Sequence, residues 1–515
     1  MRRRVGAVFV IAKRTLKLSL LFIVFSLFPG ADCTAGEGTS STHQIAAQEF
    51  RARITRALTD PALKHASVGI CIKSLKDGEV IYEKTPDKML APASNMKLVT
   101  TAAALEKLGK DYRFKTRFYL TAKPDENGIV RGYLVVKGSG DPNISGRFQP
   151  SITSLFEKVR DKLKDIGVLK IVDGIIIDDT IFDRVYIHPG WPKGQLSKWY
   201  CAEISAVSFN DNCVDLTITP GARAGRLVKI EYAPVTKYVR IKNGCQTVAS
   251  KKRHGFTVHR SWRSNNIYVT GGCWKDADPY ETSVPVHEPG RYFGTVLREV
   301  IQDAGMSVAG PVRLASRSYD EKKEHLILVT EIVSEMMPTV KVINRRSQNF
   351  YAEQLFKLLG HAEGKKGSFG EGAKVVEEYL SDLKIDKGKV IISDGSGLSS
   401  ENRLSASAIV TLLEHMHKSE LRKEYLESLA VSGLAGTSLS GRMTEEPYAG
   451  RVHAKTGSLG RNSALSGYVE NLDGDIIAFS ILINNYSGRR PEIKKFEDAV
   501  CRMLVELKTS RETEQ

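Results

Sequence analysis

The chain has 515 residues, of which 42% are hydrophobic and 26% are charged. This composition excludes a disordered or fibrous chain, and the length predicts two to four folded domains. The net charge of +16 would suit an anionic partner, but basic and aromatic residues are not interleaved as in nucleic-acid-binding surfaces. We therefore expect no nucleic acid and, at most, peripheral association with an anionic cell envelope.

Residues 1–35 have the pattern of a signal peptide. Six basic residues precede an apolar run over 18–28, and Cys33-Thr34-Ala35 offers a cleavage site. The run is short for a membrane span, although an uncleaved signal anchor is an alternative. Lipid attachment at Cys33 is disfavoured by Asp32. In either case the body of the protein is expected to be exported.

The chain then opens as an α+β protein. Apolar periodicity and turn residues predict two helices and a hairpin between them. They are a helix over 42–59, strands over 67–74 and 79–84 joined by Asp77-Gly78, and a helix from Ser94 to near Gly109.

From about residue 113 to residue 336 the sequence changes to short alternating runs separated by Gly, Pro and Asn. These runs predict a β-rich insertion over 114–335, divided into two nested domains. The predicted strands are 115–120, 132–137, 174–177, 214–218, 238–241 and 267–270, with helices over 152–164 and 294–304.

Helical periodicity returns after residue 336. The predicted helices are 340–359, 371–383, 405–417 and 492–507, with strands over 464–469 and 476–483. We expect the N-terminal hairpin and these C-terminal strands to share one sheet. Residues 36–113 and 336–515 would then form a single domain split by the insertion.

Ser94 and Lys97 are three residues apart at the start of a predicted helix. Residues at this spacing share a helix face, so an amine could take the proton of the hydroxyl and activate it as a nucleophile. Burial and a nearby cation such as Lys455 would help to keep Lys97 neutral. Two common residues at this spacing also recur by chance, and a polar helix start is the alternative.

Two further short motifs carry groups suited to the same chemistry. Ser347-Gln348-Asn349 offers a hydroxyl and a carboxamide, which could relay a proton and hold an amide, or could be surface groups of a helix. Lys455-Thr456-Gly457-Ser458 offers a lysine and a threonine that could hold a carboxylate, or could be a glycine turn. The backbone N–H groups of Ser458 and Ser94 would suit an oxyanion hole.

The ordered combination of the three motifs resembles the class C low-molecular-mass penicillin-binding proteins, the D-alanyl-D-alanine carboxypeptidase/endopeptidase family. The separation of Lys97 from Ser347 by 250 positions is similar to that of family members with inserted domains. The resemblance extends over 394–399, 402–405, 436–438 and 463–468. It implies an α+β, β-lactamase-like penicillin-binding fold: an antiparallel sheet with flanking helices, split by β-rich inserted domains.

The resemblance also implies a serine-type hydrolase that trims or cleaves peptidoglycan stem peptides ending in D-Ala-D-Ala. It acts through an acyl-enzyme, needs no cofactor or metal, and is inhibited covalently by β-lactams. It would work in the periplasm or on the outer face of a bacterial cytoplasmic membrane. The implied roles are nucleophile for Ser94, base for Lys97, proton relay for Ser347, amide ligand for Asn349, and carboxylate or backbone contacts for Lys455, Thr456, Gly457 and Ser458.

Six cysteines follow the signal segment: Cys71, Cys201, Cys213, Cys245, Cys273 and Cys501. An even number in an exported chain permits disulfides but does not assign them. The resemblance implies the pairs Cys201–Cys213 and Cys245–Cys273 within the insertion, and leaves the other two as buried thiols. Neither a CxxC pair nor an HExxH motif supports a metal site.

Three alternatives remain open from the sequence. A β-lactamase-like hydrolase would share the serine and lysine but not the long insertion. An amidase or esterase with Ser-Lys chemistry would need neither Lys-Thr-Gly nor export. A non-catalytic peptidoglycan-binding protein would not need all of the motif residues. We assign no catalytic role to His453, and the sequence leaves the choice between carboxypeptidase and endopeptidase open.

Overall fold

The computed structural model describes the backbone of residues 38–508 and the side chains from residue 48 onward. The expected signal peptide, with Cys33, lies outside the described residues. Within the described part of the chain, none of the helices combines the length and apolar character needed to cross a bilayer.

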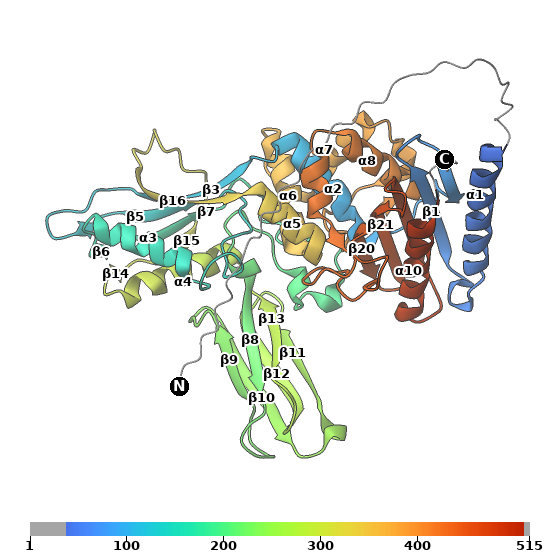
Figure 1. Ribbon diagram of the computed structural model, residues 1–515. Coiled ribbons are helices and arrows are strands. Elements are labelled where there is room, and N and C mark those ends of the chain that lie inside the picture. Colours follow the sequence, from blue (N-terminus) through green and yellow to red (C-terminus); the bar gives the residue numbers. More distant parts are fainter. Residues whose placement is uncertain (1–37, 509–515) are drawn as a thin grey trace, which may run out of the picture.

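A six-stranded sheet joins the two ends of the chain (Figure 1). In spatial order its strands are β19 (Ala430–Val431), β20 (Val452–Leu459), β21 (Asn462–Glu470), β22 (Ile476–Asn484), β1 (Ser67–Ser74) and β2 (Val80–Lys84). β1 pairs antiparallel with β22 along its whole length, as expected from the sequence. The N-terminal hairpin β1–β2 thus extends the sheet formed by strands from the C-terminus.

The two faces of this sheet are covered by different helices. Val68, Ile70 and Ile72 of β1 pack into one apolar core with α1 (Gly38–Ala57) and α10 (Arg490–Glu506), whereas Cys71 packs on the other side. Strand residues alternate between faces, so β1 contributes buried residues to both cores. The other face is covered by a helical layer: α2 (Met96–Leu108), α5 (Met336–Arg346), α6 (Asn349–Ala362), α7 (Phe369–Asp382), α8 (Ala406–Lys418) and α9 (Arg422–Ser428).

The predicted single helix over 340–359 is wrong. The structure has two helices, α5 and α6, separated at Ser347 and Gln348. Ser347 has a left-handed backbone conformation with φ of 59°, which no α-helix can continue through. Apolar periodicity on both sides of the break concealed it in the sequence.

The first and last strands of the insertion are paired with each other, so the chain departs from the helical layer and returns to it at one place. β3 (Arg113–Leu120) pairs antiparallel with β16 (Ile327–Glu335), and the next element on each side, α2 or α5, belongs to the layer. The remaining strands of this five-stranded sheet are β5 (Tyr133–Lys137), β7 (Gly174–Asp178) and β15 (Val312–Leu314). A small parallel sheet contains β4 (Ile129–Val130), β6 (Lys170–Ile171) and β14 (Ser307–Val308).

Helices α3 (Ser154–Asp165) and α4 (Pro289–Asp303) pack on the five-stranded sheet around Phe118, Phe156 and Phe293. The helix predicted for 294–304 starts earlier in the structure, at Pro289. Proline is tolerated there because the N–H groups of the first helical turn have no partner within the helix.

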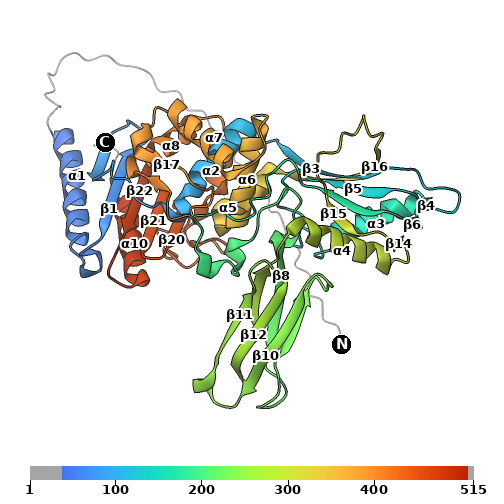
Figure 2. The same ribbon diagram turned by 180° about the vertical axis from the view of Figure 1, so that it is seen from behind.

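A second lobe projects from the insertion (Figures 1 and 2). It contains two three-stranded sheets. They are β13 (Tyr280–Pro285), β8 (Cys213–Thr219) and β9 (Lys229–Ala233), and β10 (Arg240–Val248), β12 (Asn266–Trp274) and β11 (Gly255–Arg260). Two short strands elsewhere, β17 (Val390–Ile391) and β18 (Arg403–Leu404), pair beside the helical layer.

The two expected disulfides are absent: Cys201, Cys213, Cys245 and Cys273 are all buried, free thiols. On the paired strands β10 and β12, Cys245 is opposite Gly271 and Cys273 is opposite Thr247. An offset of two residues on neighbouring strands puts the Cα atoms roughly 8 Å apart, beyond the span of a disulfide. Cys71 and Cys501 are also free and buried, and burial raises the pKa of the Cys71 thiol to about 11.

Candidate active site

Ser94 lies in a single helical turn, η2 (Ala93–Asn95), immediately before α2. The preceding residue, Ala93, has a positive φ of 45°. A Cβ on Gly397 would lie 1.8 Å from the carbonyl oxygen of Ala93, so only glycine permits this close approach. On the other side, Asn95 Nδ2 donates to the carbonyl oxygen of Lys455 at 2.8 Å. The turn that carries Ser94 is therefore held between the 394–399 loop and β20.

The side chain of Lys97 is fully buried and contacts three oxygen atoms. Its Nζ lies 2.9 Å from Ser94 Oγ, 2.7 Å from Asn349 Oδ1 and 2.7 Å from the carbonyl oxygen of Ser396. The first two sequence motifs therefore meet in the structure, because Lys97 contacts both Ser94 and Asn349. An amine in contact with a serine hydroxyl can accept its proton when the amine is neutral.

Burial lowers the pKa of Lys97 to about 7, against the opposing effect of Glu353 and Asp394. Burial is the larger of the two expected causes. The two amines disfavour each other's charged form, and the pKa of Lys455 is held well below its usual value by burial and then by Lys97. A substantial neutral fraction of Lys97 near neutral pH follows from its desolvation.

Glu353 supports Lys97 from beneath. Its carboxylate accepts the N–H groups of Gly395 at 3.0 Å and Ser396 at 2.7 Å. These contacts hold the two peptides that precede the Ser396 carbonyl, the oxygen that faces Lys97. Burial and then Asp394 raise the pKa of Glu353. Sequence reasoning assigned Glu353 no role, although its position four residues after Asn349 on α6 puts both on one helix face.

Asp394 organises the rest of the same loop. Its two oxygens accept the backbone N–H groups of Gly397 and Ser399 at 2.7 and 2.6 Å, and the side-chain N–H groups of Asn402 and Trp191 at 2.8 and 2.9 Å. A fully buried carboxylate with four donors is a rigid anchor. The 394–399 loop, which the sequence indicated only through the family resemblance, therefore forms part of the wall around Lys97.

Ser347 and Lys455 form a second hydroxyl–amine pair. Lys455 Nζ donates to Ser347 Oγ at 2.8 Å and to the carbonyl oxygen of Thr456 at 2.7 Å. The left-handed conformation of Ser347 turns the chain sharply between α5 and α6, and Lys455 reaches it from β20. The second and third motifs, 108 residues apart, meet through this contact.

The other motif residues line the same edge. Asn349 Nδ2 donates to the carbonyl oxygen of Tyr200 at 2.9 Å, and Thr456 Oγ1 donates to Ser438 Oγ at 3.0 Å. A Cβ on Gly457 would lie 3.2 Å from the backbone nitrogen of Ser94, which shows how close the two segments are. Ser438 is a further polar group that sequence reasoning left without a role.

One edge of β20 is open where Lys455, Thr456, Gly457 and Ser458 lie. The neighbouring strand β19 pairs only with His453 and Ala454, so beyond them β20 has no strand partner on that side within residues 38–508. An unpaired strand edge beside a nucleophile can bind an extended peptide. Among the residues whose side chains are described, no group of His, Cys, Asp or Glu is placed to hold a metal.

Comparison with known proteins agrees with this geometry. Residues 50–507 match the model of the D-Ala-D-Ala carboxypeptidase 3 (S13) family. A D-alanyl-D-alanine carboxypeptidase from an Actinomadura species is 31% identical over 468 residues, covering 89% of this chain and 85% of the relative. The carboxypeptidase DacB of Haemophilus influenzae is 26% identical over 438 residues, covering 84% of this chain and 88% of the relative.

The fold also has solved counterparts. The crystal structure of penicillin binding protein 4 from Haemophilus influenzae aligns with a TM-score of 0.76 at 23% identity, covering 88% of this chain and 99% of the other. This similarity confirms the expected penicillin-binding, β-lactamase-like α+β class. With a family model spanning nearly all of the described residues and a relative above 30% identity, the chain belongs to the D-Ala-D-Ala carboxypeptidase 3 (S13) family of serine peptidases.

Proposed function

We propose that this chain is a serine-type D-alanyl-D-alanine carboxypeptidase and endopeptidase that acts on peptidoglycan stem peptides and is acylated by β-lactams at Ser94. The observation that carries this proposal is the contact between Ser94 Oγ and the buried amine of Lys97 at 2.9 Å. The family supplies the substrate class, and the contact supplies a means of attack on its amide.

In the acylation step Ser94 Oγ bonds to the carbonyl carbon of the penultimate D-alanine, and its proton moves to Lys97 Nζ. The carbonyl oxygen becomes an oxyanion, for which the N–H groups of Ser94 and Ser458 are the proposed donors. The approach of Gly457 to the Ser94 nitrogen supports this assignment, because any larger side chain would fill that space.

Collapse of this intermediate breaks the C–N bond, and the leaving nitrogen needs a proton. Ser347 would supply it and take one in turn from Lys455, with which it is in contact. Lys455 and Thr456 would hold the substrate carboxylate, and Asn349 the amide on the acyl side. Water then attacks the acyl-enzyme and gives a proton through Ser347 to Lys455, while Lys97 returns its proton to the departing Ser94 Oγ and restores the free hydroxyl.

The division of labour along the chain is also proposed. Residues 36–113 and 336–515 would form the catalytic domain, and 114–335 an inserted region of two nested domains that limits access to it. The pairing of β1 with β22 and of β3 with β16 supports these boundaries. Residues 1–35 would direct export to the periplasm or to the outer face of the cytoplasmic membrane.

Two alternatives make different predictions. A β-lactamase-like enzyme would release the opened β-lactam quickly and turn over a chromogenic cephalosporin many times. A non-catalytic peptidoglycan-binding protein would bind peptidoglycan equally well after Ser94→Ala and release no product.

The test is incubation with fluorescent penicillin, followed by denaturing electrophoresis and mass measurement of the labelled peptide. We expect one long-lived label on Ser94 and none on Ser94→Ala, which keeps the fold because only one oxygen is removed. Muropeptides analysed by mass should lose D-alanine or separate into monomers with the native protein only. Equal labelling of both proteins would refute the proposal.

A further inference from the structure

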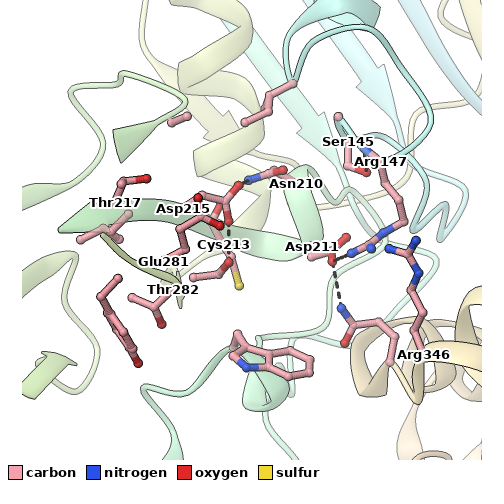
Figure 3. Close-up of a pocket in the computed structure, with 18 residues that line it drawn as sticks. Ser145, Arg147, Asn210, Asp211, Cys213, Asp215, Thr217, Glu281, Thr282 and Arg346 are labelled. Atoms are coloured by element: carbon pink, nitrogen blue, oxygen red, sulfur yellow. Dashed lines mark hydrogen bonds and ion pairs between the residues drawn. The ribbon is translucent and has the colours of Figure 1, made fainter. Parts of the chain in front are cut away.

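A large polar cavity lies between the second inserted lobe and the helical layer. Its volume is about 860 Å³, which is in the range of sites that bind an extended small ligand. Figure 3 shows Arg346 and Asp211 on one side of it and Thr217, Glu281 and Thr282 on the other. We call it the β8–β13 cavity, after the strands that form its far wall.

The β8–β13 cavity adjoins the catalytic groups through one tripeptide. Arg346 and Gln348 both line it, and the residue between them is Ser347. Ser347 contacts Lys455 and is the group proposed to protonate the leaving nitrogen. A substituent carried by that nitrogen would therefore lie beside a residue whose two chain neighbours line the cavity.

The far wall is a flat patch of polar side chains on two paired strands. In the β8–β13 register Asp215 is opposite Ser283 and Thr217 is opposite Glu281, so all four project from one face. Asp215 is held in place by Asn210 Nδ2 at 3.0 Å and by the Ser283 hydroxyl at 2.5 Å. This wall presents carboxylates and hydroxyls, which accept hydrogen bonds from N–H groups.

The near wall is built differently. Arg147 donates to Asp211 Oδ2 at 2.5 Å, and Gln348 Nε2 donates to the same oxygen at 2.9 Å. Gln348 is 7% exposed, and its Oε1 has no hydrogen-bond partner; the same holds for Asp211 Oδ1. These two oxygen atoms could each still accept a hydrogen bond.

The cavity also carries two oppositely charged groups. Arg346 and Glu281 are both exposed, and neither forms an ion pair with any other described residue. Arg346 suits a carboxylate, whereas Glu281 and Asp215 suit N–H donors. A peptide that carries its own carboxylate offers both kinds of group, and a free D-alanine would leave most of the cavity empty.

We propose that the β8–β13 cavity binds the stem peptide on the leaving side of the scissile bond, and that this site favours cross-linked peptides over a terminal D-alanine as leaving group. The inference rests on the proposed acyl transfer at Ser94 and adds a second binding region to it. Arg346 holds a carboxylate of the leaving peptide, and Glu281 with Asp215 accepts its N–H groups.

The test compares two substrates. One is a pentapeptide ending in D-Ala-D-Ala, and the other is a sugar-free cross-linked dimer of stem peptides. For Glu281→Arg we expect the kcat/KM for the dimer, divided by that for the pentapeptide, to fall about tenfold. Arg346→Gln should lower the same ratio. Glu83→Arg, an exposed strand glutamate on the far edge of the sheet, is the matched control and should leave the ratio unchanged.

The outcomes separate this inference from the function on which it rests. An unchanged ratio in Glu281→Arg overturns it, and so does a ratio that falls only when the dimer carries its sugars, which would place glycan in the cavity. If native protein is labelled by penicillin and releases D-alanine but leaves the dimer intact, the inference alone fails. If penicillin does not label Ser94, the proposed function fails first.

Discussion

The amine nitrogen of Lys97 lies 2.7 Å from the carboxamide oxygen of Asn349, a residue 252 positions further along the chain. The carbonyl oxygen of Ser396 lies at the same distance. A neutral amine has two N–H bonds and one lone pair, so these acceptors take both hydrogens and leave the lone pair for the Ser94 hydroxyl. The fold therefore orients the proposed base before a substrate arrives.

The rate of acylation should follow the protonation of Lys97. Only the neutral amine accepts a proton, and burial lowers its pKa to about 7. Below that value the rate constant for penicillin attachment should fall about tenfold per pH unit, and above it the rate should level off. Rates of labelling measured across this pH range will show the midpoint. A rate still rising at the usual lysine pKa would contradict the assignment.

Ser347→Ala should affect substrates according to their leaving group. An amide nitrogen must be protonated to depart, whereas a thiolate departs without a proton. We expect the variant to lose about 100-fold or more in kcat on a D-Ala-D-Ala amide and far less on the matching thioester. Parallel assays with both substrates test this. Equal losses on the two would mean that Ser347 shapes the site and does not transfer the proton.

Glu353→Gln should shift the pH dependence as well as weaken the fold. The glutamine nitrogen would face a backbone N–H that now donates to Glu353, at a cost of about 1–3 kcal/mol in unfolding free energy. Ionised Glu353 raises the pKa of Lys97, but burial raises the pKa of Glu353 itself to about 8, so this carboxyl is only partly ionised where Lys97 titrates. Its removal should therefore lower the acylation midpoint by a small amount. Thermal unfolding and the pH profile measure the two effects. A slower enzyme with an unmoved midpoint would leave Glu353 a purely structural role.

Gly397→Ala should displace the serine turn, since its Cβ would lie 1.8 Å from the carbonyl oxygen of Ala93. We expect penicillin labelling to fall by about 100-fold. Gly436→Ala is the matched control: it has a similar positive φ of 76° but nothing within 4 Å of a Cβ. It should cost only about 1 kcal/mol in stability and keep its labelling rate. Similar losses in both variants would show that backbone strain, not the contact with Ala93, is responsible.

The central sheet and the three motifs could be predicted from the sequence. Alternating apolar residues predicted β1 and β22, and their pairing follows because each has two apolar faces that only a sheet interior can bury. The three motifs were identified by short spacings, and each carries groups that the same chemistry needs. The cysteine pairs were misjudged because a count and a resemblance say nothing of strand register, which puts Cys245 and Cys273 two positions out of step.

The sequence by itself determined which groups are present: a serine and a lysine on one helix face, a hydroxyl and carboxamide pair, and a Lys-Thr-Gly strand. Only the tertiary structure decided the backbone conformation at Ser347 and the protonation of Lys97. The break at Ser347 depends on a backbone angle that periodicity does not report. The pKa of Lys97 depends on its desolvation by segments hundreds of residues away, because burial is a property of packing and not of spacing.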